Sequence, residues 1–202
     1  MRLGIFGGSF DPIHRGHIEP VAAVRRALQL ERVIYLPTAQ PPHKPRRRFA
    51  PAFARFAMVE LALLDRPECR TSAFELTPGE RAYTVRTVRH FRDRHPEASL
   101  FLILGADSLL RFHTWRQWRE ILEIARLAVM VRPGWRLEQP SEGIPAELRD
   151  HIPGDRVHLV ENSPLAISSS EVRRLLAEEP AAAVPLLPDL VLRYINKYAL
   201  YT

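Results

Sequence analysis

The feature that most constrains this chain is the stretch formed by residues 7–17, which reads Gly-Gly-Ser-Phe-Asp-Pro-Ile-His-Arg-Gly-His. It directly follows a short apolar run, residues 3–6, which is typical of a buried strand that ends at the glycine pair. A helical pattern begins near Gly16, so the stretch lies at a strand-to-helix junction. Free backbone N–H groups and the helix dipole favour negative charge at such a junction. We therefore expect an anion-binding site here, with His14 and His17 beside it.

This junction differs from two common nucleotide-binding motifs. It contains neither the G-x-G-x-x-G pattern of dinucleotide-binding proteins nor the Gly-Lys-Ser/Thr ending of a Walker A loop. Two histidines, three residues apart, are present instead of the Walker lysine.

Strand-like and helix-like segments alternate along the chain. Proline at position 20 predicts an irregular start of the first helix. Thr84, Thr114 and Ser168 are candidate N-caps, and Glu171 completes a capping box with Ser168. We expect strands over residues 3–6, 32–36, 69–76, 100–104, 127–131 and 157–160, and helices over residues 16–30, 51–64, 84–94, 115–124, from 169 onward and 189–198.

This alternation predicts an α/β fold, with a Rossmann-like, doubly wound parallel sheet and a small C-terminal helical subdomain. We expect one domain over residues 1–202, with a core of about 1–160 and a helical part of about 161–202. Ligands of such sheets bind at the carboxyl ends of the strands. The loops that follow strands should therefore meet at one edge: residues 7–17, 41–44, 105–108 and 167–170.

Charge and cysteine content narrow the class of protein. The chain has 29 Lys and Arg against 23 Asp and Glu, a net charge of +6. This surplus fits either nucleic-acid binding or an enzyme with phosphorylated substrates, and the dense run 44–48 is either a solvated loop or a phosphate contact. A single cysteine, Cys69, allows no internal disulfide and favours a cytoplasmic setting. The sequence also shows no signal peptide and no apolar run long enough for a membrane span.

The predicted edge offers imidazoles, hydroxyls, guanidiniums and helix N-termini. It offers no Ser or Cys nucleophile with an evident base and no zinc-ligand spacing. Such groups suit phosphoryl transfer, in which positioning and charge neutralisation do most of the work. Mg²⁺ would assist the departure of pyrophosphate.

Five ordered motifs resemble those of a known family. Residues 7–17 are similar to the His-X-Gly-His signature of the nucleotidyltransferase α/β-phosphodiesterase superfamily, and residues 167–173 resemble its second signature. Residues 36–44, 83–85 and 105–109 with 114–115 narrow the resemblance to the bacterial nicotinate-nucleotide adenylyltransferases. The resemblance spans nearly the whole chain and includes its ending, from Pro188 through Ile195.

The resemblance implies adenylyl transfer from ATP to nicotinate mononucleotide, with Mg²⁺ accompanying ATP and no metal ligands from the protein. By this resemblance, His14, His17 and Arg173 are catalytic, and Lys44, Thr84 and Trp115 bind the nicotinate nucleotide. In the family, the residue at the position of Thr84 recognises the nicotinate carboxylate. The aromatic residue at the position of Trp115 stacks on the pyridine ring. The ATP-binding residues implied are Gly7, Gly8, Ser9, Phe10, Asp107, Ile167, Ser168 and Arg173.

Each of these residues also has a structural interpretation. Ser168 can cap its helix and bind phosphate at once, because one helix N-terminus can do both. Arg173 could be an exposed helix arginine, Asp107 a helix cap, and Trp115 a core residue; Trp118 more readily packs in the core. Lys44 lies in a proline-rich loop that suits a lid, but it could equally be solvated.

The chain departs from the family at Arg86, where relatives usually carry an acidic residue two positions after the threonine. A cation near the pyridine pocket could favour the acid over the amide, so nicotinamide mononucleotide stays open as an alternative acceptor.

Other classes fit the sequence less well. A phosphopantetheine adenylyltransferase would lack the Pro-Pro-His-Lys stretch of residues 41–44 and the stretch around Trp115. A class I aminoacyl-tRNA synthetase would need a Lys-Met-Ser-Lys-Ser motif and a longer chain. A basic nucleic-acid-binding domain would explain the charge but not the motif-bearing loops, so we expect no nucleic-acid or membrane partner. Homo-oligomerisation stays open.

Overall fold

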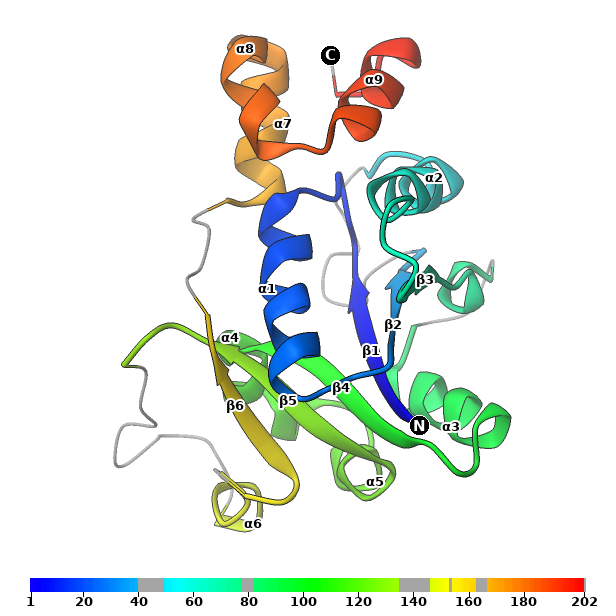
Figure 1. Ribbon diagram of the computed structural model, residues 1–202, viewed down its shortest axis with the longest axis vertical. Helices are drawn as coiled ribbons and strands as arrows, with labels where there is room; N and C mark the ends of the chain where they lie inside the picture. The colour runs from blue at the N-terminus through cyan, green and yellow to red at the C-terminus, as the bar shows by residue number, and fades with distance from the viewer. Residues whose placement is uncertain (40–48, 78–81, 135–145, 153, 163–166, 202) are drawn as a thin grey trace. The chain divides into compact units, whose positions relative to one another are not determined.

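The computed structural model describes residues 1–39, 49–77, 82–134, 146–152, 154–162 and 167–201. Within these residues, the strands form one six-stranded parallel sheet in the order β3-β2-β1-β4-β5-β6 (Figure 1). The α/β prediction is confirmed. The strands are β1 Arg2–Gly8, β2 Arg32–Pro37, β3 Cys69–Thr71, β4 Ser99–Gly105, β5 Ala125–Val131 and β6 Val157–Glu161.

Helices connect these strands and follow the last of them. The C-terminal segments after β6 are helical, as the sequence predicts for this part of the chain. The α-helices are α1 Arg15–Ala27, α2 Ala52–Ala62, α3 Thr84–Arg94, α4 Ala106–Leu110, α5 Trp118–Ile124, α6 Ala146–Arg149, α7 Ser169–Glu178, α8 Pro180–Ala183 and α9 Asp189–Lys197, and the 3₁₀ turns are η1 Phe74–Leu76, η2 Phe112–Thr114 and η3 Val184–Leu186.

The central strands β1, β4 and β5 pair in parallel. Leu3 of β1 pairs with Leu100 of β4, and Leu102 of β4 pairs with Leu127 of β5. These apolar residues are buried on both faces, as continuous apolar runs predict. The strand order reverses between β1 and β4, which is the position where ligands of doubly wound sheets bind.

Two of the predicted elements that are shorter than expected have a clear local cause. The strand expected over 69–76 ends at Thr71, because the Ser72 hydroxyl accepts a hydrogen bond from the Phe74 N–H at 3.3 Å and turns the chain into η1. The helix expected over 115–124 begins only at Trp118. Its N-cap is Gln117, which has a left-handed backbone (φ 54°) and therefore interrupts any helix from Trp115.

Three predictions about helix starts are wrong. Tyr83, rather than Thr84, is the N-cap of α3. The Thr114 hydroxyl caps no helix, because it donates to the Arg111 carbonyl at 2.7 Å within η2. Helix α1 extends from Arg15 to Ala27 with Pro20 inside it, so the irregular start expected from this proline is not observed, although the proline removes one N–H donor from the helix.

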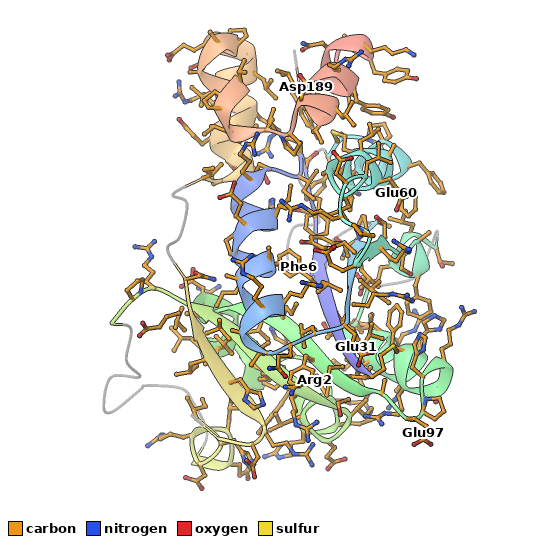
Figure 2. The ribbon with its side chains drawn as sticks, viewed as in Figure 1. Arg2, Phe6, Glu31, Glu60, Glu97 and Asp189 are labelled. Carbon is orange, nitrogen blue, oxygen red and sulfur yellow. The ribbon has the colours of Figure 1, made fainter. Side chains whose placement is uncertain are left out.

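The chain forms two compact units. The first unit comprises Met1–Phe6, Pro20–Val33 and Tyr83–Pro164, and the second comprises Gly7–Glu19, Ile34–Ala82 and Leu165–Thr202. In the first unit, the Arg2 N–H donates to the Glu31 carboxylate at 2.9 Å and joins the starts of β1 and β2 (Figure 2). In the second unit, α9 packs on α2 and α8 on α7.

No helix among the described residues is long and apolar enough to cross a membrane.

Candidate active site

Strand β1 continues through Gly7 and Gly8, so the glycine pair does not end the strand as the sequence predicts. The segment of residues 7–14, called the glycine turn here, belongs to the second unit. The Gly8 carbonyl accepts hydrogen bonds from the Thr38 N–H at 3.0 Å and from the Thr38 hydroxyl at 3.4 Å, so the turn is joined to the end of β2. Phe10 is fully buried with a left-handed backbone (φ 46°). A bulky residue adopts this conformation only where its surroundings enforce it. A Cβ on Gly7 would meet no atom within 4 Å, so the backbone of the turn is open on that side.

The rings of His14 and His17 are in contact at the start of α1, with their planes tilted by 34°. Their ring centroids are 3.8 Å apart, and the His14 N–H donates to Nδ1 of His17 at 3.3 Å. Because Nδ1 of His17 accepts this bond, the neutral ring carries its proton on Nε2 and can donate it to a ligand. Within the described part of the chain, Nδ1 of His14 is buried without a hydrogen-bond partner.

Both imidazoles are neutral at neutral pH. His14 is only 2% exposed, and burial lowers its pKa to about 4. Burial lowers the pKa of His17 as well, and repulsion from His14 lowers it further. Two contacting imidazoles cannot both be protonated at low cost, so the pair offers N–H donors rather than two fixed positive charges.

Gly16 lies between the histidines at a position where a side chain would be tightly packed. A Cβ at this position would lie 3.0 Å from His14 Nδ1 and 3.3 Å from the Cβ of Ile167. The same contact shows that the two sequence motifs, although some 150 positions apart, meet in the second unit.

Helix α7 begins against the glycine turn. Ser168 is its N-cap, and the hydroxyl accepts from the Glu171 N–H at 3.1 Å. This half of the predicted capping box is confirmed, whereas the Glu171 carboxylate binds Arg174 at 2.8 Å. The Ser169 hydroxyl donates to the Pro12 carbonyl at 3.1 Å, which holds the N-terminus of α7 on the turn.

Arg173 binds the same turn from one helical turn further along α7. Its Nη1 donates to the Asp11 carbonyl at 2.5 Å and approaches the Asp11 carboxylate at 3.4 Å, and its Nη2 donates to the Ser170 hydroxyl at 3.1 Å. Arg173 is therefore not a freely solvated surface residue.

Two functional candidates, Asp11 and Arg55, were not singled out by the sequence. The guanidinium of Arg55 is 1% exposed and donates to the carbonyls of Ser9 at 2.5 Å, Ala39 at 2.9 Å and Ala50 at 3.0 Å. Burial lowers its pKa, and the nearby Asp11 carboxylate opposes that shift. The sequence gives only a weak indication of this role. Arg55 lies among the apolar residues of the expected helix, and a charge buried there needs hydrogen-bonding partners.

The remaining predicted site residues lie in the first unit or outside the described residues. Asp107 is exposed in the first turn of α4, whose N-cap is Gly105, so Asp107 is not a helix cap. Thr84 is the first residue of α3, and Trp115 is half-buried, with its ring 5.4 Å from that of Phe112. Trp118 is buried, as predicted. Lys44 and the basic run 44–48 lie outside the described residues.

Comparison with known proteins identifies the family. A family model described as cytidylyltransferase-like matches residues 5–175. A probable nicotinate-nucleotide adenylyltransferase of Symbiobacterium thermophilum is 40% identical over 203 residues, which cover 99% of this chain and 95% of the relative. The chain belongs to the nicotinate-nucleotide adenylyltransferase family. A probable nicotinate-nucleotide adenylyltransferase of Pelobacter propionicus is 35% identical over 214 residues. The aligned region covers 100% of this chain and 99% of the relative.

Solved structures agree with the family fold. The nicotinic acid mononucleotide adenylyltransferase of Plasmodium falciparum complexed with NaAD superposes with a TM-score of 0.78 at 18% identity, covering 99% of this chain and 97% of that chain. At this identity, the likeness establishes the fold of this family member.

Among the described residues, no group of three or more His, Cys, Asp or Glu side chains could hold a metal ion. Asp11, the buried carboxylate of the turn, already accepts from Ala50 N–H and Tyr201 and faces Arg173. A magnesium ion at this turn would therefore need most of its oxygen ligands from a nucleotide and water.

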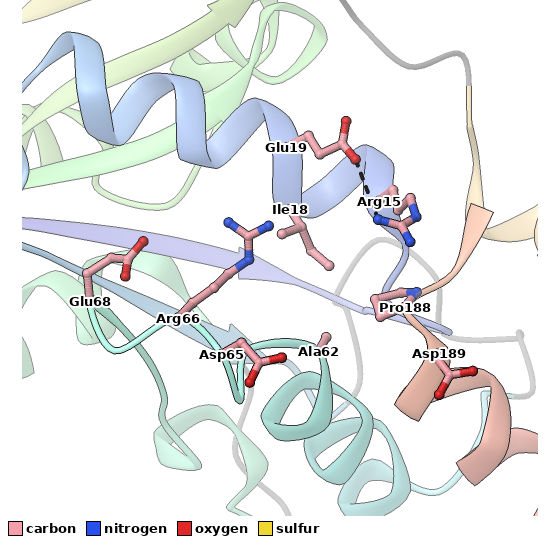
Figure 3. A pocket seen from close by; sticks show the side chains of 9 residues that line it. All are labelled: Arg15, Ile18, Glu19, Ala62, Asp65, Arg66, Glu68, Pro188 and Asp189. Atoms are coloured by element: carbon pink, nitrogen blue, oxygen red, sulfur yellow. Dashed lines mark ion pairs between the residues drawn. The ribbon is translucent and has the colours of Figure 1, made fainter. Parts of the chain in front are cut away.

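A separate pocket of about 470 Å³ lies in the second unit (Figure 3). Its lining includes Arg15 and Glu19 of α1, whose charged groups are 3.9 Å apart, Asp65 and Arg66 beyond α2, and Asp189 of α9. With Glu68, four carboxylates outnumber the two guanidiniums of this lining, and none of the described lining residues is a histidine. The pocket thus differs in chemistry from the turn that carries His14 and His17.

Proposed function

We propose that this family member transfers the adenylyl group of ATP to nicotinate mononucleotide, which yields nicotinate adenine dinucleotide and pyrophosphate in NAD biosynthesis. In this reaction an oxygen of the acceptor phosphate bonds to the α-phosphorus of ATP. The bond from that phosphorus to the bridging oxygen breaks, and its electron pair leaves with pyrophosphate. The observation that carries the proposal is the neutral histidine pair placed against the N-terminus of α7.

The acceptor needs no general base. A phosphate monoester has a second pKa of about 6 and is mostly dianionic at neutral pH. The protein must instead bring two anions together and stabilise the charge that grows on the α-phosphate. Donors aimed at developing charge are the usual means of doing so.

His17 and His14 would supply these donors. The Nε2–H of His17 would donate to an α-phosphate oxygen, because its Nδ1 is occupied by the His14 N–H. The approach of a phosphate raises the pKa of a neighbouring imidazole, so one ring of the pair can take up a proton as charge grows. The backbone of Gly7, Gly8, Ser9 and Phe10 would lie along the nucleotide, with its open side at Gly7.

Helix α7 would bind the leaving pyrophosphate. Its N-terminal N–H groups near Ile167 and Ser168 favour anions, and Arg173 adds a guanidinium suited to phosphate oxygens. Mg²⁺ would enter with ATP, held by the phosphates, and would neutralise charge on the leaving group.

Thr84, Trp115, Asp107 and Lys44 are proposed to bind the nucleosides on the basis of the family resemblance. Trp115 would stack on the pyridine ring, Thr84 would read the nicotinate carboxylate, Asp107 would bind the adenosine ribose, and Lys44 would contact phosphate. We propose that the enzyme acts in the cytoplasm on small molecules, without a nucleic-acid partner.

A panel of acceptors tests both the reaction and its selectivity. Pyrophosphate release with ATP and Mg²⁺ should be fastest with nicotinate mononucleotide, slower with nicotinamide mononucleotide and undetectable with phosphopantetheine. The half-buried Arg86 is the reason to expect a higher kcat/KM for the acid, because a cation near the pyridine would attract a carboxylate. Equal kcat/KM for acid and amide would contradict this selectivity, and turnover of phosphopantetheine alone would contradict the proposed function.

A further inference from the structure

The buried carboxylate of Asp11 joins the glycine turn to the end of the chain. Asp11 is 1% exposed, and its Oδ1 accepts from the Tyr201 hydroxyl at 2.8 Å and from the Ala50 N–H at 3.0 Å. Its Oδ2 faces Nη1 of Arg173 at 3.4 Å. Tyr201 is the penultimate residue of the sequence, so a residue 190 positions away completes the surroundings of Asp11.

The backbone around Tyr201 indicates that this end of the chain is held in place. Ala199 and Tyr201 both have left-handed backbones, with φ of 48° and 67°. Such conformations are unfavourable for residues other than glycine and persist where surrounding contacts determine them. The hydrogen bond to Asp11 is one such contact, and the packing of α9 on α2 supports the segment that leads to it.

Asp11 sets the orientation of Arg173. Nη1 of Arg173 is directed at the Asp11 carbonyl and carboxylate, while Nη2 donates to the Ser170 hydroxyl. A guanidinium has five N–H donors in a rigid plane. The contacts of Nη1 therefore fix the direction of the other N–H groups of this guanidinium. Within the described part of the chain, its Nε–H and one Nη2–H have no protein acceptor.

We propose that Tyr201 is a positioning residue for the phosphate site. Its hydroxyl holds the Asp11 carboxylate, and Asp11, through its carbonyl and its carboxylate, holds Arg173 in the orientation in which its remaining N–H groups meet the β- and γ-phosphates of ATP. This inference rests on the proposed role of Arg173 toward ATP. Tyr201 itself contacts no substrate.

Replacing Tyr201 with phenylalanine removes only the hydroxyl. The Asp11 carboxylate then lacks one of its two donors on Oδ1 and can turn away from the geometry that Arg173 requires. We expect the dissociation constant and the KM for ATP to rise about three- to tenfold, the effect of one lost hydrogen bond, with the KM for nicotinate mononucleotide unchanged.

Tyr198→Phe is the matched control. Tyr198 lies at the same end of the chain, is 54% exposed and contacts Tyr194 at 4.7 Å between ring centroids rather than Asp11. Calorimetric titration of the full-length protein with ATP and Mg²⁺ should give the wild-type dissociation constant for Tyr198→Phe. Thermal unfolding of both variants reports whether the fold is intact.

A double-mutant cycle with Arg173→Ala decides whether Tyr201 acts through Arg173. We expect Tyr201→Phe to weaken ATP binding in the wild-type background and to have no further effect in the Arg173→Ala background. An unchanged dissociation constant for Tyr201→Phe overturns the proposal, and so does an equal effect in both backgrounds. A variant that fails to fold, or that raises the KM of both substrates together, also overturns it, because Tyr201 would then be structural.

These outcomes are separate from a failure of the proposed function. If the wild-type protein forms no dinucleotide, the function is wrong. The ATP titrations still report on Tyr201, because they need no acceptor and no turnover.

Discussion

Replacing His17 with alanine is expected to lower kcat about 100-fold or more, while the fold and the affinity for ATP stay close to those of the wild type. The reason is that the Nε2–H of His17 would act mainly on charge that develops in the transition state. Removing one well-placed donor of this kind typically costs about 10²–10³ in rate. Steady-state kinetics with ATP and nicotinate mononucleotide, together with ATP titration, measures both quantities.

Two further variants sharpen this result. His17→Gln keeps an N–H donor close to the position of Nε2, so its kcat should lie between those of the wild type and His17→Ala. His151→Ala removes a half-buried imidazole in the first unit and should leave kcat unchanged. A His17→Ala variant that keeps its rate, or that simply unfolds, would show that the histidine does not act on the transition state.

Replacing Arg55 with methionine is expected to reduce the free energy of unfolding by about 3–5 kcal/mol, the usual cost of breaking a buried charge network. Methionine retains an apolar stem but none of the donors. The carbonyls of Ser9, Ala39 and Ala50 would lose their guanidinium partner, and the buried Asp11 carboxylate would lose a nearby positive charge. Urea denaturation measures the change.

Arg193→Met is the control for this prediction. Arg193 lies in the same unit, its side chain is 73% exposed, and its ion pair with Asp189 is 3.9 Å long. Exposed pairs of this kind contribute little, so the change should stay within about 0.5 kcal/mol. A loss below about 1 kcal/mol for Arg55→Met would mean that water satisfies the three carbonyls and that Arg55 does not organise the turn.

The fold was largely predictable because its signals are local. The apolar runs that become β1, β4 and β5 are continuous, and Ser168 caps α7 as the sequence predicts. Local competition explains the errors. The Ser72 hydroxyl ends β3 early, and the left-handed Gln117 delays α5 until Trp118. Single-residue hydrogen bonds of this kind are not visible in hydrophobic periodicity.

The candidate site was predictable in part. The resemblance of residues 7–17 and 167–173 pointed to His14 and Arg173, and the structure brings these two motifs together through Gly16 and Ile167. The network of Arg55, Asp11 and Tyr201 was missed because its members meet only after folding. No sequence pattern links an arginine in a helix to a tyrosine near the chain terminus.

The fate of the α-phosphorus of ATP tests adenylyl transfer most directly. The protein is incubated with nicotinate mononucleotide, Mg²⁺ and ATP labelled at the α-phosphorus, and the products are separated. We expect the label to appear in the dinucleotide, with one unlabelled pyrophosphate released for each dinucleotide formed. Label that ends in AMP alone, or release of the γ-phosphate as inorganic phosphate, would contradict adenylyl transfer by this site.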